Sequence, residues 1–158
     1  MRRTLVWKGL DAPRMEIAHV EVSGDRLRAR GTQIGAAYEL RYEVEEPRLH
    51  VEMVGGPALD LELAQGRDHF DLAHAPLFNS LPVLRHGLHR GGRTRDFVMS
   101  WVTVPELEVK PSEQRYEPIR PGLIRYRGSH RAEVSSFDLE FDEDGFVLLY
   151  PGLAERIA

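Results

Sequence analysis

The chain has 158 residues, of which 42% are hydrophobic and 29% charged, and its formal net charge is −4 at pH 7. This composition is typical of a folded globular domain, and the acidic balance argues against broad nucleic-acid binding, which relies on surplus Lys and Arg. The absence of cysteine excludes disulfides, thiolate metal ligands and cysteine nucleophiles. No run reaches the ~18 apolar residues of a transmembrane segment, and the N-terminus meets Lys8 and Asp11 before any run long enough for export. We therefore expect one cytoplasmic domain over residues 1–158, without a transmembrane segment.

Alternation of apolar and polar residues predicts β-strands throughout the first half of the chain. Two hairpins are expected, one turning at Ser23-Gly24-Asp25 and the other at Gly55-Gly56-Pro57. The alternating runs are Ala18–Val22 with Leu27–Ala29, then Ala36–Val44, then Leu49–Met53 with Leu59–Leu63.

The segment from Ala64 to Leu81 has no clean period. Its apolar content favours order, so we predict a long ordered loop, a kind of segment that is often functional in compact domains.

Strands are predicted again in the second half of the chain. Phe97–Val104 is apolar on nearly both faces and is therefore expected to be a central strand covered on both sides. Helical periodicity is weak, and the ten prolines and fourteen glycines are scattered as turn residues. The further candidate strands are Leu107–Val109, Arg115–Ile119, Leu123–Arg127, Arg131–Phe141 and Phe146–Tyr150. The fold class predicted is all-β.

Three polar segments of the chain are candidates for chemical sites, and two of them contain possible metal ligands. His69, Asp71 and His74 offer metal-ligand atoms, but their spacing matches no established zinc pattern, so partly exposed histidines and an aspartate bonded to loop amides are favoured. Asp142–Gly145 resembles the start of a calcium loop, but Leu153 stands where the bidentate Glu should be, which favours an acidic turn. No metal site and no cofactor are predicted.

The segment from Leu84 to Arg95 contains four arginines and two histidines around Gly91-Gly92. Guanidinium groups bind phosphate or carboxylate in bidentate fashion, so an anionic headgroup is one candidate partner. Aromatic residues for base stacking are absent, which again disfavours nucleic acid. A solvated hairpin tip is the favoured alternative.

Several motifs occur in the order found in a known bacterial family. They are His69–Leu72, Ala75–Pro82, Gln114–Tyr116, Arg125–Tyr126, Asp144–Val147 and Tyr150–Gly152. With these motifs the chain resembles the putative glycolipid-binding family from about Asp68 to Gly152, and more loosely before that. His69, Ala75 and Phe78 differ from the family pattern, and tryptophans expected in its middle strands are missing.

The resemblance implies a single domain of long antiparallel strands curled into an open or half-closed barrel, similar to bacterial lipoprotein and lipid carriers. It also implies a glycolipid or another amphipathic small molecule as the partner. The candidate ligand-binding residues, at or near matching motif positions, are Asp71, Asn79, Arg85, Arg115, Tyr116 and Tyr126.

Three functions are therefore expected in descending order. The first is a non-enzymatic lipid- or glycolipid-binding protein, with the ligand's tail against aliphatic strand faces and its head near Arg85 or Tyr116. The second is an interaction or assembly module whose sheet is filled by its own side chains. The third is an enzyme that uses Asp71 and His74 as acid and base. No nucleophile elbow or phosphate-binding glycine loop supports the third.

Overall fold

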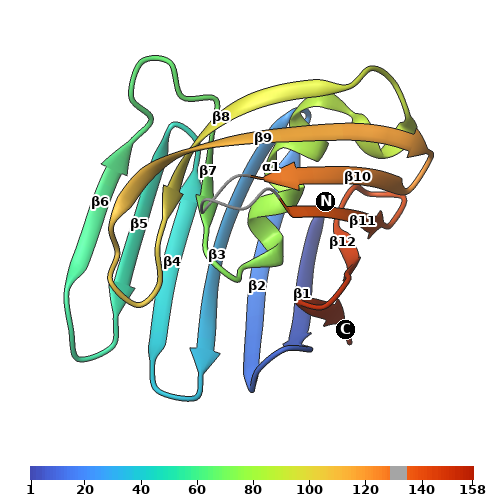
Figure 1. Cartoon of the computed structure of the whole chain (residues 1–158). Helices are drawn as coiled ribbons and strands as arrows, with labels where there is room; N and C mark the ends of the chain where they lie inside the picture. The colour runs from blue at the N-terminus through green and yellow to red at the C-terminus, as the bar shows by residue number, and fades with distance from the viewer. Residues whose placement is uncertain (129–134) are drawn as a thin grey trace.

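The computed structural model describes residues 1–128 and 135–158, which form a curled, mostly antiparallel sheet around the helix α1 (Figure 1). The helix α1 spans Pro76–His86 and is followed by a short 3-10 turn, η1, at Leu88–Arg90. The strands are β1 Arg2–Gly9, β2 Arg14–Ser23, β3 Arg26–Gly35, β4 Glu39–Glu45, β5 Arg48–Met53, β6 Ala58–Glu62, β7 His69–Leu72, β8 Arg95–Val102, β9 Val109–Arg120, β10 Leu123–Gly128, β11 Ser135–Phe141, β12 Val147–Tyr150 and β13 Ala154–Arg156.

Within the described residues, thirteen strands lie in one sheet in the order β6-β5-β4-β3-β2-β1-β13-β12-β11-β10-β9-β8-β7. Neighbouring strands are antiparallel except β7 and β8, which are parallel. The β7 end curls back toward the N-terminal half, where Glu46 Oε2 accepts from the Phe70 N–H at 2.8 Å and Gln33 Nε2 donates to the Ala73 carbonyl at 3.1 Å. The predicted all-β, half-closed barrel is confirmed.

Both predicted hairpins are present. In β2 and β3, Ser23 pairs with Arg26, and Gly24 takes the left-handed φ of 62° that the tight turn requires. In β5 and β6, Glu52 pairs with Ala58 around the Gly55-Gly56-Pro57 turn. The alternation predicted each of these strands because one face is buried and the other is exposed along its length.

The prediction of a long loop between Ala64 and Leu81 is wrong, because this segment contains β7 and the start of α1. The helix starts with Pro76 in its first turn and ends at Gly87, whose φ is 66°. It lies in the hollow of the sheet, so that all eight residues from Pro76 to Val83 are buried. A helix buried on every side has no polar stripe, and its sequence therefore shows no helical period.

Three other predictions need correction. Phe97–Val104 corresponds to β8, which is next to the edge strand β7 rather than central, and its Val98 and Trp101 are only half-buried. Leu107 has a φ of 56° and belongs to no strand, so of the predicted strand Leu107–Val109 only Val109 is in a strand, as the first residue of β9. The basic segment is not a hairpin tip, because it includes the last turn of α1 and η1. Of the predicted strand Arg131–Phe141, the part before Ser135 lies outside the described residues.

A buried acid lies where α1 begins. Glu16 is 2% exposed and accepts a hydrogen bond of 2.6 Å from the Tyr42 hydroxyl. The Tyr42 ring lies against Gly31, where an added Cβ would come within 2.3 Å of the ring, so only glycine leaves room for it. Burial raises the pKa of Glu16 from 4.5 to about 8, although Tyr42, the Leu77 N–H in the first turn of α1 and Arg14 all favour the ionised form.

The turn at Asp142–Gly145 is an acidic turn built around one carboxylate. Asp142 Oδ1 accepts from the N–H groups of Asp144 and Phe146, while Oδ2 is bound by Arg3 and Arg156. Burial alone would raise the pKa of Asp142, but these partners outweigh it and lower the pKa below its usual value. The turn thereby ties β1 and β13 to the loop between β11 and β12.

No helix in the described part of the chain is long and apolar enough to cross a membrane.

We predict that Glu16→Gln removes a distinctive pH dependence of stability. Because the pKa of Glu16 is higher in the folded state, the wild-type chain loses stability as the pH rises from about 4.5, and the loss levels off above about 8. The loss should be roughly 3 to 5 kcal/mol at 1.36 kcal/mol per pKa unit. The amide keeps the acceptor for Tyr42 but does not titrate. Urea unfolding of both proteins at several pH values tests this, and parallel stability curves would show that the carboxyl is not buried as described.

Candidate functional site

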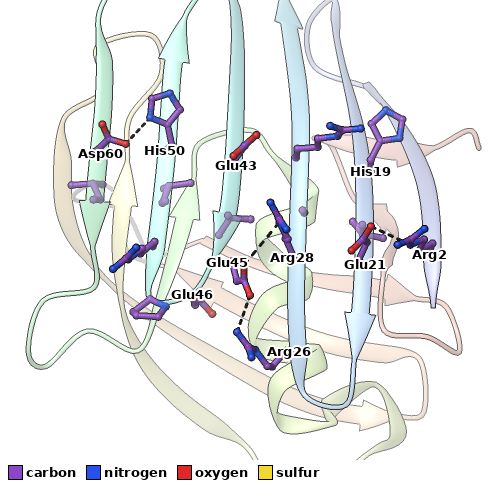
Figure 2. A pocket seen from close by; sticks show the side chains of 18 of the residues that line it. Arg2, His19, Glu21, Arg26, Arg28, Glu43, Glu45, Glu46, His50 and Asp60 are labelled. Carbon is purple, nitrogen blue, oxygen red and sulfur yellow. Dashed lines mark hydrogen bonds and ion pairs between the residues drawn. The ribbon is translucent and has the colours of Figure 1, made fainter.

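A groove of about 1130 Å³ lies on the outer face of the N-terminal half of the sheet. Its walls are outward-facing side chains of β1 to β6, on the side opposite α1 (Figure 2). Six arginines and six carboxylates line it together with two histidines. The groove is therefore strongly polar while its formal charges balance.

The charges in this groove form rows across the strands. One row alternates in sign from β1 to β6, and its members are Arg2, Glu21, Arg28, Glu45, Arg48 and Glu62. Ion pairs join Arg2 to Glu21 at 3.1 Å and Arg48 to Glu62 at 3.4 Å. Exposed pairs of this kind add little stability, so the row chiefly fixes where donors and acceptors lie.

A second hollow of about 670 Å³ adjoins the groove. The two share His19, Arg30, Glu43 and His50, so they form one continuous depression. Arg30 and Glu43 are opposite each other on β3 and β4, but no ion pair joins them in the described part of the chain. The hydrogen bond to Asp60 is the largest cause that raises the pKa of His50, and Glu52 acts in the same direction.

Beyond the second hollow, at the start of β2 and the end of β3, polar side chains point into the core and apolar side chains point outward. The inward positions of β2 and β3 there are Glu16 and Gln33, which pair directly. The outward positions are Met15, Ile17 and Ile34, which are 41%, 36% and 45% exposed. Apolar side chains thus face solvent where polar ones are expected.

These side chains belong to a wider apolar band on the outer face. Val6 pairs with Ile17, and the Ile157 N–H donates to the Val6 carbonyl, which extends the band toward β13. At the other end, the Val54 N–H donates to the backbone carbonyl of Glu39, and Glu39 is the cross-strand partner of Ile34. Val54 therefore lies one strand beyond Glu39 on the side away from Ile34. The apolar band comprises Val6, Met15, Ile17, Ile34, Val54 and Ile157. Because Ile17 also lines the second hollow, the band continues from the polar groove.

Four of the six residues predicted to bind ligand come together, but inside the core. Gln114 Nε2 donates to Asp71 Oδ2 at 2.7 Å, and Asn79 Nδ2 donates to the Tyr116 hydroxyl at 3.2 Å. The rings of Tyr116 and Tyr126 meet edge to face with centroids 5.3 Å apart. Their exposed fractions are between 0% and 7%, so this cluster satisfies buried polar groups beneath α1.

The other two predicted residues are separate and exposed. Arg85 lies at the end of α1 and pairs with Asp25 at 3.1 Å, while Arg115 on β9 pairs with Asp96 at 2.7 Å. The structure does not bring either of them to the buried cluster.

The candidate metal ligands are also separated from one another. His69 is buried against Glu46 and His86, Asp71 accepts from Gln114, and His74 is exposed with a φ of 63°. Among the described residues, no group of three His, Asp or Glu side chains is arranged to hold a metal ion.

Comparison with known proteins identifies the family. Residues 60–156 match the family described as putative glycolipid-binding, which is more than half of the chain. The chain belongs to this family. No curated protein matches it in sequence. A crystal structure of a DUF1089 family protein from Pseudomonas aeruginosa is similar over 92% of this chain and 79% of that one, with a TM-score of 0.59 and 24% identity. At that identity the similarity supports the fold alone.

In this member of the putative glycolipid-binding family, sequence reasoning missed the groove and the apolar band. Alternation predicts only that the charged positions of these strands lie on one face, and nothing in one strand shows which charges adjoin in the next. The sequence does contain a signal for the band. When the inward-outward alternation of β2 is extended back to Met15-Glu16-Ile17, and that of β3 forward to Gln33-Ile34, the polar residues fall on the inner face and the apolar residues on the outer face.

We predict that Tyr116→Phe lowers stability by about 1 kcal/mol, because the buried Asn79 amide loses a partner while the ring packing is kept. Chemical denaturation measures the loss. A second variant, Tyr38→Phe, removes a half-buried hydroxyl that donates to the buried Gln33, and should cost a similar amount by the same mechanism. A Tyr116→Phe protein as stable as the wild type would contradict a structural role for the cluster.

Proposed function

We propose that the protein is a non-enzymatic binding protein that takes a sugar-bearing amphiphile on the outer face of β1 to β6. The observation that carries the proposal is the continuity of a charge-balanced polar groove with an apolar band on one face of the sheet. The family description points to the same class of ligand.

The groove suits the polar head of such a ligand. A sugar hydroxyl both donates and accepts hydrogen bonds, and the lining offers guanidinium donors beside carboxylate acceptors. Arg30 and Glu43 lie at the junction of the two hollows and are not paired with each other, so both are available to a hydroxyl-rich group. A formally balanced lining gives no general preference for an anion or a cation.

The apolar band suits the hydrocarbon tail. Each CH₂ group removed from water contributes about 0.8 kcal/mol, so even partial coverage of Met15, Ile17 and Ile34 yields useful affinity. From Arg30 to Ile34 along β3 is about 13 Å at 3.3 Å per residue, which places head and tail sites within one short amphiphile's reach.

The inner face supports this placement because it is already occupied. Leu77, Phe78 and Val83 of α1 are at most 1% exposed, and Tyr42 and Phe78 pack with ring centroids 5.1 Å apart. A tail inside the sheet would have to displace the helix, whereas the outer face needs no rearrangement.

A protein-interaction module is the second candidate. The filled inner face favours it, as does the breadth of the apolar band, which crosses from β5 to β13. The same band would then seat another protein in place of a lipid tail.

We predict saturable binding of monomeric dodecyl maltoside, and weaker binding by about 10-fold for Ile34→Ser, since burial of an Ile side chain is worth about 1.5 to 3 kcal/mol and coverage here is partial. The matched control is Ile119→Ser on β9, where the isoleucine is 44% exposed against 45% for Ile34. Arg30→Ala should also weaken binding, with Arg127→Ala on β10 as its control.

Calorimetric titration below the critical micelle concentration measures these affinities. Equal weakening in Ile34→Ser and Ile119→Ser, or no saturable binding at all, would overturn the proposal. Self-association of the wild type that Ile34→Ser abolishes, followed by sedimentation, would favour the interaction module instead.

A further inference from the structure

Four side chains from separate elements form a hydrogen-bonded chain that starts at Glu46, one of the residues that line the polar groove. His69, the first residue of β7, places Nδ1 2.7 Å from Glu46 Oε1 in the turn between β4 and β5. Its Nε2 is 3.1 Å from Nε2 of His86, the last residue of α1. His86 Nδ1 is 3.1 Å from an Arg95 guanidinium nitrogen at the start of β8.

The chemistry of these groups fixes the direction of every bond in the chain. Arginine has only donors, so His86 Nδ1 must accept and its proton must be on Nε2. That proton is donated to His69 Nε2, which leaves the His69 proton on Nδ1, where it is donated to Glu46. All three bonds coexist only when both imidazoles are neutral, with Glu46 as the final acceptor.

These hydrogen-bond directions argue against a metal ion that bridges the Nε2 atoms of His69 and His86. A histidine that binds metal through Nε2 carries its proton on Nδ1 and donates it to an acceptor. Here the neighbour of His86 Nδ1 is Arg95, which can only donate. The pair is therefore arranged for proton-dependent hydrogen bonding.

The surroundings favour a neutral His86 at neutral pH. Burial, followed by His69, Arg95 and Arg85, lowers the pKa of His86 and outweighs the opposing effect of Asp68. The Phe97 ring packs against both imidazoles, with centroid distances of 5.3 Å to His69 and 5.1 Å to His86. His69 is 4% exposed, His86 is half-buried and Arg95 is exposed, so the chain is open to solvent at its Arg95 end.

We propose that this chain is an acid-sensitive latch that holds the C-terminal end of α1 between the starts of β7 and β8, and so restrains residues 87–94, which join α1 to β8. A proton on His69 points its Nε2–H at the Nε2–H of His86 and breaks their bond, while it strengthens the pairing with Glu46. A proton on His86 points Nδ1–H at Arg95 and breaks that bond. Acid therefore releases the end of the helix while β7 stays attached to the β4–β5 turn.

A second histidine on the released segment acts in the same direction. His89 in η1 is 6% exposed and packs beside Gly145, where an added Cβ would lie 2.9 Å from its Nδ1. Burial and Arg90 lower the pKa of His89 and outweigh the Val83 carbonyl, Asp142 and Asp144, which favour the charged form. Charging His89 on acidification thus also loosens residues 87–94.

The first test is the tautomer pattern of the wild-type protein by long-range ¹H–¹⁵N NMR at neutral pH. We expect the proton on Nδ1 of His69 and on Nε2 of His86. The opposite tautomer at either ring would overturn the latch, and this readout needs no variant.

The second test is amide hydrogen exchange of residues 84–95 and of β3 at pH 7 and pH 5, corrected for intrinsic rates. We expect protection of 84–95 to fall at least 10-fold on acidification, while protection of β3 does not fall. His86→Phe should remove most of this response, and His19→Gln, on the outer face, should keep it. Equal responses in wild type and His86→Phe would overturn the latch. The exchange is measured without amphiphile, and His69, His86 and Arg95 line neither hollow, so the result does not depend on amphiphile binding.

Discussion

The enclosure of α1 by the curled sheet is the constraint on which the rest of the structure depends. A sheet with one apolar face must cover that face, and here one short helix covers much of it from within. The helix in turn has no exposed side along Pro76–Val83, so it requires the sheet on all sides. Because each covers the other, side chains of α1 such as Leu77 and Phe78 fill the inner face along the described residues, and this is the reason for proposing a binding surface on the outside.

The same enclosure explains the inverted polarity at one end of β2 and β3. The loop and first turn that begin α1 bring backbone polar groups into the interior, and no side chain of the helix caps its N-terminus. The inward side chains Glu16 and Gln33 provide partners for these groups. Glu16 accepts from the Leu77 N–H, and Gln33 donates to the Ala73 carbonyl. Since side chains alternate along a strand, polar residues placed inward force their neighbours Met15, Ile17 and Ile34 outward.

Much of the strand content was predictable from sequence, and the helix was not. The hairpins turning at Gly24 and at Gly55-Gly56 follow from period-two alternation and turn glycines, which are local properties. The helix α1 lacks a period because it is buried on every side, and Pro82 inside it further lowers its helical propensity. Pro76 and Gly87 bracket it in the manner typical of helix ends, and this was the available local signal.

The candidate site was less predictable because it depends on register between strands. Family motifs drew attention to Asp71, Asn79 and Tyr116, which are adjacent in the fold but are occupied with satisfying one another in the core. The groove instead arises where charges on six strands fall into the same rows, and a shift of one residue in any pairing would turn those charges inward. The pairing that creates the groove is the pairing that buries the core, so the packing of the interior fixes the strand positions from which the outer charges and the apolar band project.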